Sequence, residues 1–399
     1  MRGFKKSRAP GVSPFRDSFL PFSQPWIDQE EIEAVSEVLK SGWLTTGKKT
    51  IQFEEEFASY IGSPHALAFN SCTGGLHCAL AALGIGSGDE VITSVLTFAA
   101  TANVVCHLQA EPVFVDIDPG TLNMDITQIE GKITKKTKAI IPVHYGGRPC
   151  PMDEIYKLAK SYGLYVVEDA AHALGAEYKG KKIGTLESEV ACFSFYPTKC
   201  ITTGEGGMNT TFSPELAQKM KVWRLHGISR DAWDRYQKGG SWYYEVICPG
   251  FKYNLTDMAS ALGLAQLKKA ASFQKRREEL VAQYREKLKS LPFILPPPFE
   301  DGKHAWHLFA VQLKLGDLTC TRDEFVEALA RENIGSSVHF IPLHLMPFYQ
   351  SKGYNPGDFP QAEEVYRRLI SLPLFPKMSN EDLESVVRAL KKLVEWYSR

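Results

Sequence analysis

Apolar residues recur with helical spacing along much of the first two thirds of the chain, and short β-branched runs lie between these segments. The helical spacing predicts helices over residues 29–41, 49–61, 74–83 and 152–162. The β-branched runs predict strands over residues 90–96, 112–117, 139–145, 164–169 and 190–195. Strands that alternate with helices in this way are typical of βαβ units, so we expect an α/β fold with a largely parallel sheet.

The pattern changes after about residue 265. A long charged helix is predicted over residues 267–291, followed by the proline-rich LPPPF, the strand-like HAWHLFAVQL and helices over 322–332 and 380–396. A chain of 399 residues exceeds one ordinary core, so we expect more than one domain. The predicted division is a flexible N-terminal extension, a large domain and a smaller C-terminal domain, over residues 1–20, 21–265 and 266–399.

Composition narrows the class of protein. The chain is 44% hydrophobic and 23% charged, and its 46 Lys and Arg balance its 46 Asp and Glu, as in ordinary globular proteins. This balance gives no indication of a nucleic-acid or membrane partner. The basic first sixteen residues lack the apolar stretch of a signal peptide, and no run approaches the roughly 18 apolar residues of a membrane span.

The cysteines and histidines predict neither a disulfide framework nor a metal site. Eight cysteines are scattered singly without a C-x-x-C pair, which fits a reducing cytoplasm. The pairs His304/His307 and His339/His344 have no Cys or carboxylate neighbours in the pattern, so packing or substrate contact is expected of them and no metal is predicted.

Lys199 lies between a predicted buried strand and a glycine cluster, in FSFYPTKCITTGEGG over residues 193–207. Pro197 ends the strand because its ring removes a ladder donor. Lys199 is therefore expected at a strand end facing a cavity, where desolvation lowers the pKa of a lysine and suits it to carbonyl cofactors such as pyridoxal phosphate. Taken alone, the position is also that of an ordinary solvated loop lysine.

The predicted strand YVVED ends in Glu168 and Asp169, followed by two alanines and His172. An acid at the carboxyl end of a strand lies where open α/β sheets bind ligands. A pyridoxal cofactor needs such a carboxylate against its ring nitrogen, because the protonated nitrogen makes the ring an electron sink. By spacing alone, Asp169 would also serve as the cap of a following helix.

The segment NSCTGG, residues 70–75, leads into the predicted helix over 74–83. A hydroxyl and glycines at a helix start form an anion site, because free N–H groups and the helix dipole favour a phosphate. The missing side chain at Gly74 lets that phosphate approach closely. Ordinary N-capping explains the same residues.

Four segments together closely resemble the sugar aminotransferases of the DegT/DnrJ/StrS family: NSCTGGLHCAL, VEDAAHALGA, FSFYPTKCITTGEGG and GFKYNLTDMASALGLAQL. Their order matches that of the family, and the resemblance covers nearly all of residues 20–399. It implies the type I pyridoxal phosphate aminotransferase fold, with a large domain around a mostly parallel mixed sheet flanked by helices and a smaller α+β C-terminal domain.

The resemblance also implies roles for individual residues. Lys199 would form the Schiff base with pyridoxal phosphate and shuttle the proton, which is general acid–base work. Asp169 would pair with the ring nitrogen, and His172, glutamine in many relatives, would contact the ring hydroxyl. The remaining implied cofactor contacts are a stacking aromatic, Phe98, and a phosphate site made by Thr73, the Gly74 backbone and Ser194.

In relatives, the segment that matches GFKYNLTD reaches into the neighbouring subunit's cofactor site, which implies a homodimer with two composite active sites. Where many members read G-Y-N-Y-R, this chain has Lys252 and Asn254, and both remain candidates for the phosphate contact. Two further departures are Cys200, where the family usually has asparagine, and Cys72, where many relatives have glycine.

The finer resemblance concerns the substrate. The segments PFSQPWIDQEEIEAVSEVLKSGWLTTG, HGISRDAWDR and HAWHLF look most like the branch that acts on UDP-linked 4-keto sugars, such as the 4-amino-4-deoxy-arabinose enzyme. The implied reaction moves an amino group from L-glutamate to the keto carbon of a nucleotide sugar, for cell-envelope polysaccharide, lipopolysaccharide or glycan biosynthesis. Trp43, Trp306 and His339 are candidates for the substrate side, with packing as the alternative for the aromatics.

Two other functions are alternatives to an aminotransferase. The sugar dehydratases of the same fold replace the Schiff-base lysine with histidine, whereas this chain has Lys199. A regulatory homologue that has lost catalysis would be expected to lose Asp169, Lys199 or the Thr73 segment, and all three are present. An aminotransferase is therefore the main hypothesis.

Overall fold

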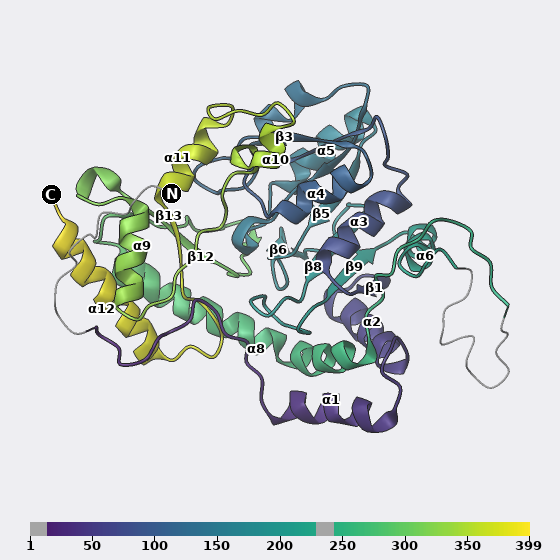
Figure 1. Cartoon of the computed structure of the whole chain (residues 1–399), viewed down its shortest axis with the longest axis horizontal. Helices are drawn as coiled ribbons and strands as arrows, with labels where there is room; N and C mark the ends of the chain where they lie inside the picture. The colour runs from purple at the N-terminus through teal and green to yellow at the C-terminus, as the bar shows by residue number, and fades with distance from the viewer. Residues whose placement is uncertain (1–13, 229–242) are drawn as a thin grey trace.

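A seven-stranded sheet forms the centre of the computed structural model, which describes residues 14–228 and 243–399 (Figure 1). The strand order is β1-β9-β8-β5-β4-β2-β3, and β9 alone runs antiparallel to its neighbours. The strands are β1 (His65–Phe69), β2 (Glu90–Ser94), β3 (Glu111–Val115), β4 (Thr137–Ile141), β5 (Tyr165–Asp169), β8 (Val190–Ser194) and β9 (Gly207–Thr211). The predicted α/β fold with a mostly parallel sheet is confirmed.

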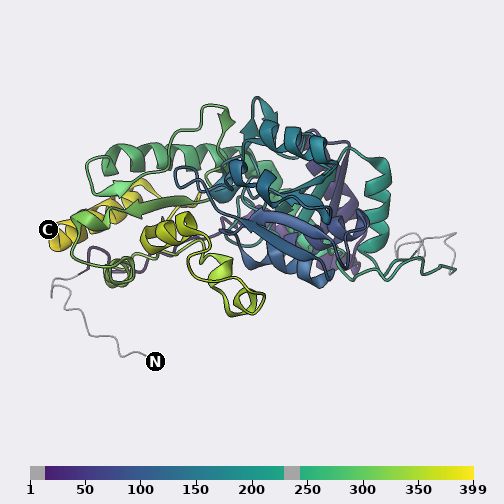
Figure 2. The same cartoon turned by 90° about the horizontal axis from the view of Figure 1, so that it is seen from above.

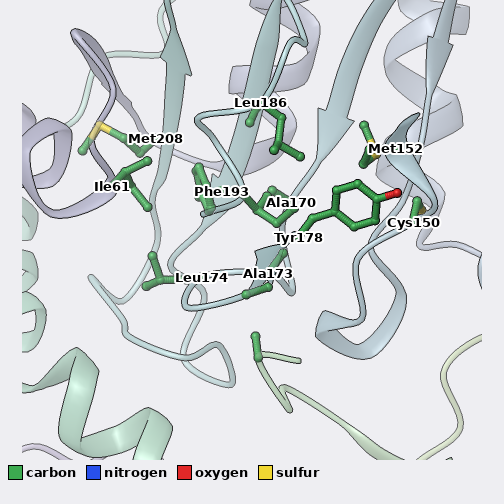
Figure 3. Packing of buried hydrophobic residues seen from close by; sticks show 14 of the residues in the cluster. Ile61, Cys150, Met152, Ala170, Ala173, Leu174, Tyr178, Leu186, Phe193 and Met208 are labelled. Atoms are coloured by element: carbon green, nitrogen blue, oxygen red, sulfur yellow. The ribbon is translucent and has the colours of Figure 1, made fainter. Parts of the chain in front are cut away.

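The sheet is covered on both faces. Successive residues of a strand point to opposite sides, so each strand contributes side chains to two cores. Ile140, Val166 and Phe193 belong to one core, together with residues of α2 (Lys48–Ile61) and α5 (Met152–Tyr162). Figure 3 shows part of this core, including Phe193, Met208 and Met152. Ile141 and Val167 belong to the core on the other face, which is closed by α3 (Cys72–Ala82), α4 (Ala99–His107) and α6 (Pro214–Trp223).

The apolar pattern does not predict β1 or β9. The sequence of β9 is GMNTT, yet all five residues are buried. Its polar side chains donate hydrogen bonds to backbone carbonyls: the Asn209 amide donates to Gly75, the Thr210 hydroxyl to Gly184 and the Thr211 hydroxyl to Glu189. Burial of hydrogen-bonded polar groups is tolerated in a core, but it removes the hydrophobic signal that sequence patterns rely on.

Helix α8 (Asp257–Leu288) joins the large domain to the small one. In Figure 1 it runs across the lower part of the molecule, above α1, towards α9 (Arg322–Arg331) and α12 (Asn380–Tyr397), and Figure 2 shows the same helix from above. It begins ten residues before the predicted start at 267, because the Thr256 hydroxyl caps it by accepting the Ala259 N–H. The proposed boundary at 265/266 therefore falls inside one helix.

The small domain is built around a three-stranded sheet of β10 (Phe293–Ile294), β12 (Phe309–Leu313) and β13 (Leu369–Leu372). Leu20 pairs with Ile334 and is buried in the core of this domain, whereas residues 1–13 of the predicted extension lie outside the described residues. Helix α1 (Gln29–Ser41) packs against α8. Two further described helices are α10 (Pro347–Gln350) and α11 (Pro360–Arg368). A minor sheet consists of β11 (Gly302–Lys303), β6 (Glu177–Tyr178) and β7 (Lys181–Lys182). None of the described helices is long and apolar enough to cross a bilayer.

Candidate active site

A cavity of about 470 Å³ opens at the carboxyl edge of the parallel strands, within the size range of small-molecule sites. The segments that follow β1, β2, β5 and β8 all contribute to it, which is where an open α/β sheet binds ligands. It is lined by six of the residues predicted from sequence, which lie far apart along the chain: Thr73, Phe98, Asp169, His172, Ser194 and Lys199.

Lys199 lies in the loop over residues 195–206 that joins β8 to β9. Backbone hydrogen bonds tie this loop down, since the Lys199 N–H donates to the Tyr196 carbonyl at 2.9 Å and the Phe195 N–H to the Gly206 carbonyl at 2.9 Å. Burial lowers the pKa of the Lys199 amine, and the Asp169 carboxylate acts in the opposite direction. The lysine is therefore held facing the cavity, in surroundings that favour the neutral, nucleophilic amine.

Asp169 ends β5 and is buried. Its Oδ2 accepts the Thr101 hydroxyl at 2.7 Å, and its Oδ1 accepts the Ala171 N–H at 3.1 Å. Burial raises the pKa of this carboxyl group, and the two hydrogen bonds lower it. The carboxylate has a fixed orientation and faces the same cavity as Lys199.

The buried pair of Glu168 and His144, on the opposite face of the sheet, helps to fix the position of Asp169. Glu168 points to the opposite face from Asp169 and meets His144 Nε2 at 2.7 Å, with both side chains fully buried. His144 Nδ1 accepts the Cys150 N–H at 3.0 Å, so the proton of this ring is on Nε2 and is donated to Glu168. The backbone N–H of His144 donates to the backbone carbonyl of Asp169 at 3.2 Å, which joins the ends of β4 and β5.

His172 presents a proton to the cavity. Its Nδ1 accepts the Gly146 N–H at 3.2 Å, so a neutral ring carries its proton on Nε2. Burial keeps the pKa of His172 well below its ordinary value, with Lys199 adding to the effect, so the ring stays neutral at physiological pH. His172 is therefore a hydrogen-bond donor towards a ligand, as contact with a phenolate oxygen would require.

The start of α3 forms the anion site expected from NSCTGG, with one change in detail. Ser71 is the N-cap and its hydroxyl accepts the Gly74 N–H at 3.0 Å, so that N–H is already occupied. The first N–H groups of a helix have no partner within it, which leaves those of Cys72 and Thr73 for a ligand. A Cβ at Gly74 would lie 3.0 Å from Asn70 Oδ1 and 3.1 Å from the Tyr253 ring, so any larger residue there would crowd both neighbours.

The residues singled out from the sequence that lie outside the lining of this cavity include Lys252, Asn254, Trp43 and Trp306. Lys252 is exposed, and the Asn254 amide donates to the Thr46 hydroxyl at 2.7 Å. Trp306 stacks on His304 with ring centroids 3.7 Å apart and packs against the core of the small domain, while the Trp43 indole donates to the Thr46 carbonyl. The segment HGISRDAWDR lies outside the described residues from 229 onward.

The structure adds cavity residues that the sequence reasoning did not place there. Thr97, Phe340 and Tyr196 line the cavity beside His339 and His307, for which packing or substrate contact is expected from the sequence. His307 packs on His172 with ring centroids 4.3 Å apart, although the two are distant in sequence. The available signal for Thr97 was its place directly before Phe98, with a second threonine four residues later in TFAAT.

The chain is similar over most of its length to known proteins. The family model described as the DegT/DnrJ/EryC1/StrS aminotransferase family matches residues 25–391. The chain belongs to this family. The resemblance drawn from the four motifs is thereby confirmed.

Relatives of this aminotransferase family extend the match. The spore coat polysaccharide biosynthesis protein SpsC of Bacillus subtilis is 51% identical over 383 residues, covering 95% of this chain and 98% of SpsC. Helicobacter pylori PseC, an aminotransferase involved in the biosynthesis of pseudoaminic acid, has a TM-score of 0.89 with 34% identity, covering 96% of this chain and all of PseC. Spr1654 of Streptococcus pneumoniae, described as a sugar aminotransferase and solved in its PLP form, has a TM-score of 0.88 with 32% identity, covering 95% and 99%.

Pyridoxal phosphate is the cofactor of this aminotransferase family, and the groups around the cavity fit it. Lys199 supplies an amine, Asp169 a fixed carboxylate for a protonated ring nitrogen, and the start of α3 free N–H groups for a phosphate. Phe98 is 62% exposed and lines the cavity, where its ring is available for stacking. The individual contacts of these residues with the cofactor remain predictions.

Four buried histidines and the half-buried His339 predict a loss of stability in acid. Burial lowers the pKa of each in the folded protein, to about 4 for His77 and His339 and well below 6.5 for His172, His304 and His307. Below pH 6.5 the unfolded chain binds protons that the folded protein does not, so the stability falls with pH by up to about 1.4 kcal/mol per pH unit for each histidine. Thermal unfolding of the full chain between pH 7.5 and pH 5 measures this slope.

His304→Asn is the matched variant, because His304 lies outside the lining of the cavity. His304 Nδ1 accepts the backbone N–H of Trp306 at 2.9 Å, and an asparagine oxygen can accept the same N–H. We expect the stability of the variant to fall less steeply with falling pH than that of the wild type. The difference in slope should correspond to the uptake of about one proton fewer on unfolding. An unchanged slope in the variant would contradict the assigned role of His304.

Proposed function

We propose that this chain transfers an amino group from L-glutamate to the keto carbon of a nucleotide-linked sugar, a UDP-4-keto sugar, by ping-pong chemistry. The observation that carries the proposal is the convergence of Lys199, Asp169 and the start of α3 on one cavity. The bound cofactor supplies the electron sink, Lys199 moves the proton at the reacting carbon, and Asp169 keeps the ring nitrogen charged.

The lining of the cavity supports a sugar as the acceptor. His307, His339, Tyr196 and Phe340 line the same cavity as Lys199 with uncharged polar groups and aromatic rings, and such groups suit the hydroxyls and faces of a sugar ring. Two relatives support a role in making cell-surface polysaccharide or glycan. SpsC is described as a spore coat polysaccharide biosynthesis protein, and PseC is involved in the biosynthesis of pseudoaminic acid.

A homodimer with shared active sites is part of the proposal. Lys199 is the only lysine or arginine among the described residues that line the cavity, whereas a cofactor phosphate and a sugar diphosphate together carry several negative charges. Cations from a second subunit would balance them. Of the two candidates, Asn254 is held within its own chain by Thr46, whereas Lys252 is exposed, which favours Lys252.

The substrate can be tested in two half-reactions on the purified holoenzyme. L-Glutamate is expected to remove the absorption band at about 400–430 nm that a lysine-linked pyridoxal cofactor gives. A UDP-4-keto sugar should then restore the band, and 3-keto sugars or GDP and dTDP analogues should do so more slowly. A band that glutamate leaves unchanged would exclude this donor, and recovery with only a 3-keto or non-UDP sugar would exclude this acceptor.

A further inference from the structure

The hydroxyls of Thr97 and Thr101 form a chain of two hydrogen bonds that ends at the Asp169 carboxylate. Thr97 follows β2, and Thr101 lies one helical turn later, in the first turn of α4. The two Oγ1 atoms are 2.8 Å apart, and Thr101 Oγ1 is 2.7 Å from Asp169 Oδ2. All three residues are buried, with exposed fractions of 1%, 0% and 5% along this line.

The direction of the two hydrogen bonds follows from the number of protons. An ionised carboxylate only accepts, so the single Thr101 hydroxyl proton is donated to Asp169. The Thr101 oxygen then accepts from Thr97, whose proton is donated to it. Thr97 thereby commits Thr101 to Asp169, and hydrogen bonds arranged in series strengthen each other in a medium of low dielectric.

We propose that Thr97 and Thr101 are positioning residues that keep Asp169 ionised and aimed at the cofactor ring nitrogen. The proposal rests on the proposed aminotransferase chemistry, in which Asp169 faces that nitrogen. Burial favours the neutral acid, and a neutral acid cannot form an ion pair with a protonated ring. The Thr101 hydroxyl opposes this tendency by a bond to the charged form.

A cofactor analogue separates this role from a general effect on folding. Pyridoxal phosphate and its 1-deaza analogue differ only in the ring atom that faces the carboxylate, so the ratio of their dissociation constants from the full-length apoenzyme reports that contact. Thr101→Val keeps the side-chain shape and removes the hydroxyl. We expect it to reduce the wild-type preference for pyridoxal phosphate by about tenfold, the typical effect of leaving one buried acceptor unpaired.

Three other variants complete the series. Thr101→Ser restores the hydroxyl and should restore the preference, while Thr97→Val should reduce it by a smaller factor because Thr101 still reaches Asp169. Thr93→Val is the matched control, since Thr93 is buried in β2 and donates its hydroxyl to the Ile141 carbonyl at 2.8 Å, away from the cavity lining. It should keep the wild-type preference.

The outcomes are distinct. A wild-type preference in both Thr101→Val and Thr97→Val would overturn the proposal, and so would equal weakening of both ligands. If Thr101→Val does not fold, Thr97→Val decides the question by the same ratio. A wild-type chain that binds neither ligand would instead overturn the proposed function.

Discussion

Lys199→Ala is expected to lower the aminotransferase rate by at least about 10⁴-fold, because the variant loses the group that transfers the proton as well as the covalent link to the cofactor. The amine stands in a loop fixed by backbone hydrogen bonds and faces the cavity that Asp169 and His172 line, so no other lysine or arginine among the described lining residues can replace it. Single-turnover rates with L-glutamate measure the loss, and the band at about 400–430 nm should be absent or shifted.

Lys160→Ala is the matched control, because Lys160 is exposed on α5. Its rate should equal that of the wild type. Added methylamine should partly restore the reaction of Lys199→Ala, since a small free amine can move the proton that Lys199 normally moves. A Lys199→Ala variant that keeps the wild-type rate would refute the assigned role of Lys199.

Asp169→Asn is expected to lower the rate by about 10³-fold, roughly 4 kcal/mol in the activation free energy, which is the scale for removing a group that stabilises developing charge. An asparagine cannot hold a proton on the ring nitrogen by charge, so the ring becomes a poorer electron sink. In the variant the amide oxygen can still accept the Ala171 N–H, and the amide N–H can donate to the Thr101 oxygen in place of the lost bond, so the fold should persist. The half-reaction with L-glutamate is again the measurement.

A cofactor methylated at the ring nitrogen tests the cause of this effect. Its ring carries a permanent positive charge, so it should restore part of the lost rate in Asp169→Asn. Asp153→Asn, at a surface carboxylate whose side chain is 57% exposed, should match the wild type with either cofactor. Failure of the methylated cofactor to improve Asp169→Asn would mean that the aspartate acts in some way other than through ring charge.

The sequence predicted most of the parallel strands because their apolar runs point into cores on both faces, as Val166 and Val167 do. It did not predict β9, whose polar side chains reach carbonyls on other segments, such as Gly75 and Glu189. Those partners are brought close only by the tertiary fold.

The predicted site residues that follow strands or start a helix meet at one cavity, as Asp169, Ser194 and Thr73 do, since the carboxyl ends of parallel strands share an edge. For His307 the sequence leaves packing and substrate contact as alternatives, because it comes from the small domain and its position depends on how that domain packs. Lys252 lies outside the cavity of its own chain, so a sequence or a single chain cannot position it against a cofactor.

The central claim is that Lys199 holds pyridoxal phosphate covalently. Reduction of the purified holoenzyme with borohydride would fix that link permanently, and peptide mass spectrometry would locate it. We predict a phosphopyridoxyl group on Lys199, and its loss when L-glutamate is added before the reduction. A group on any other lysine, or none in an enzyme that shows the band at about 400–430 nm, would contradict the account.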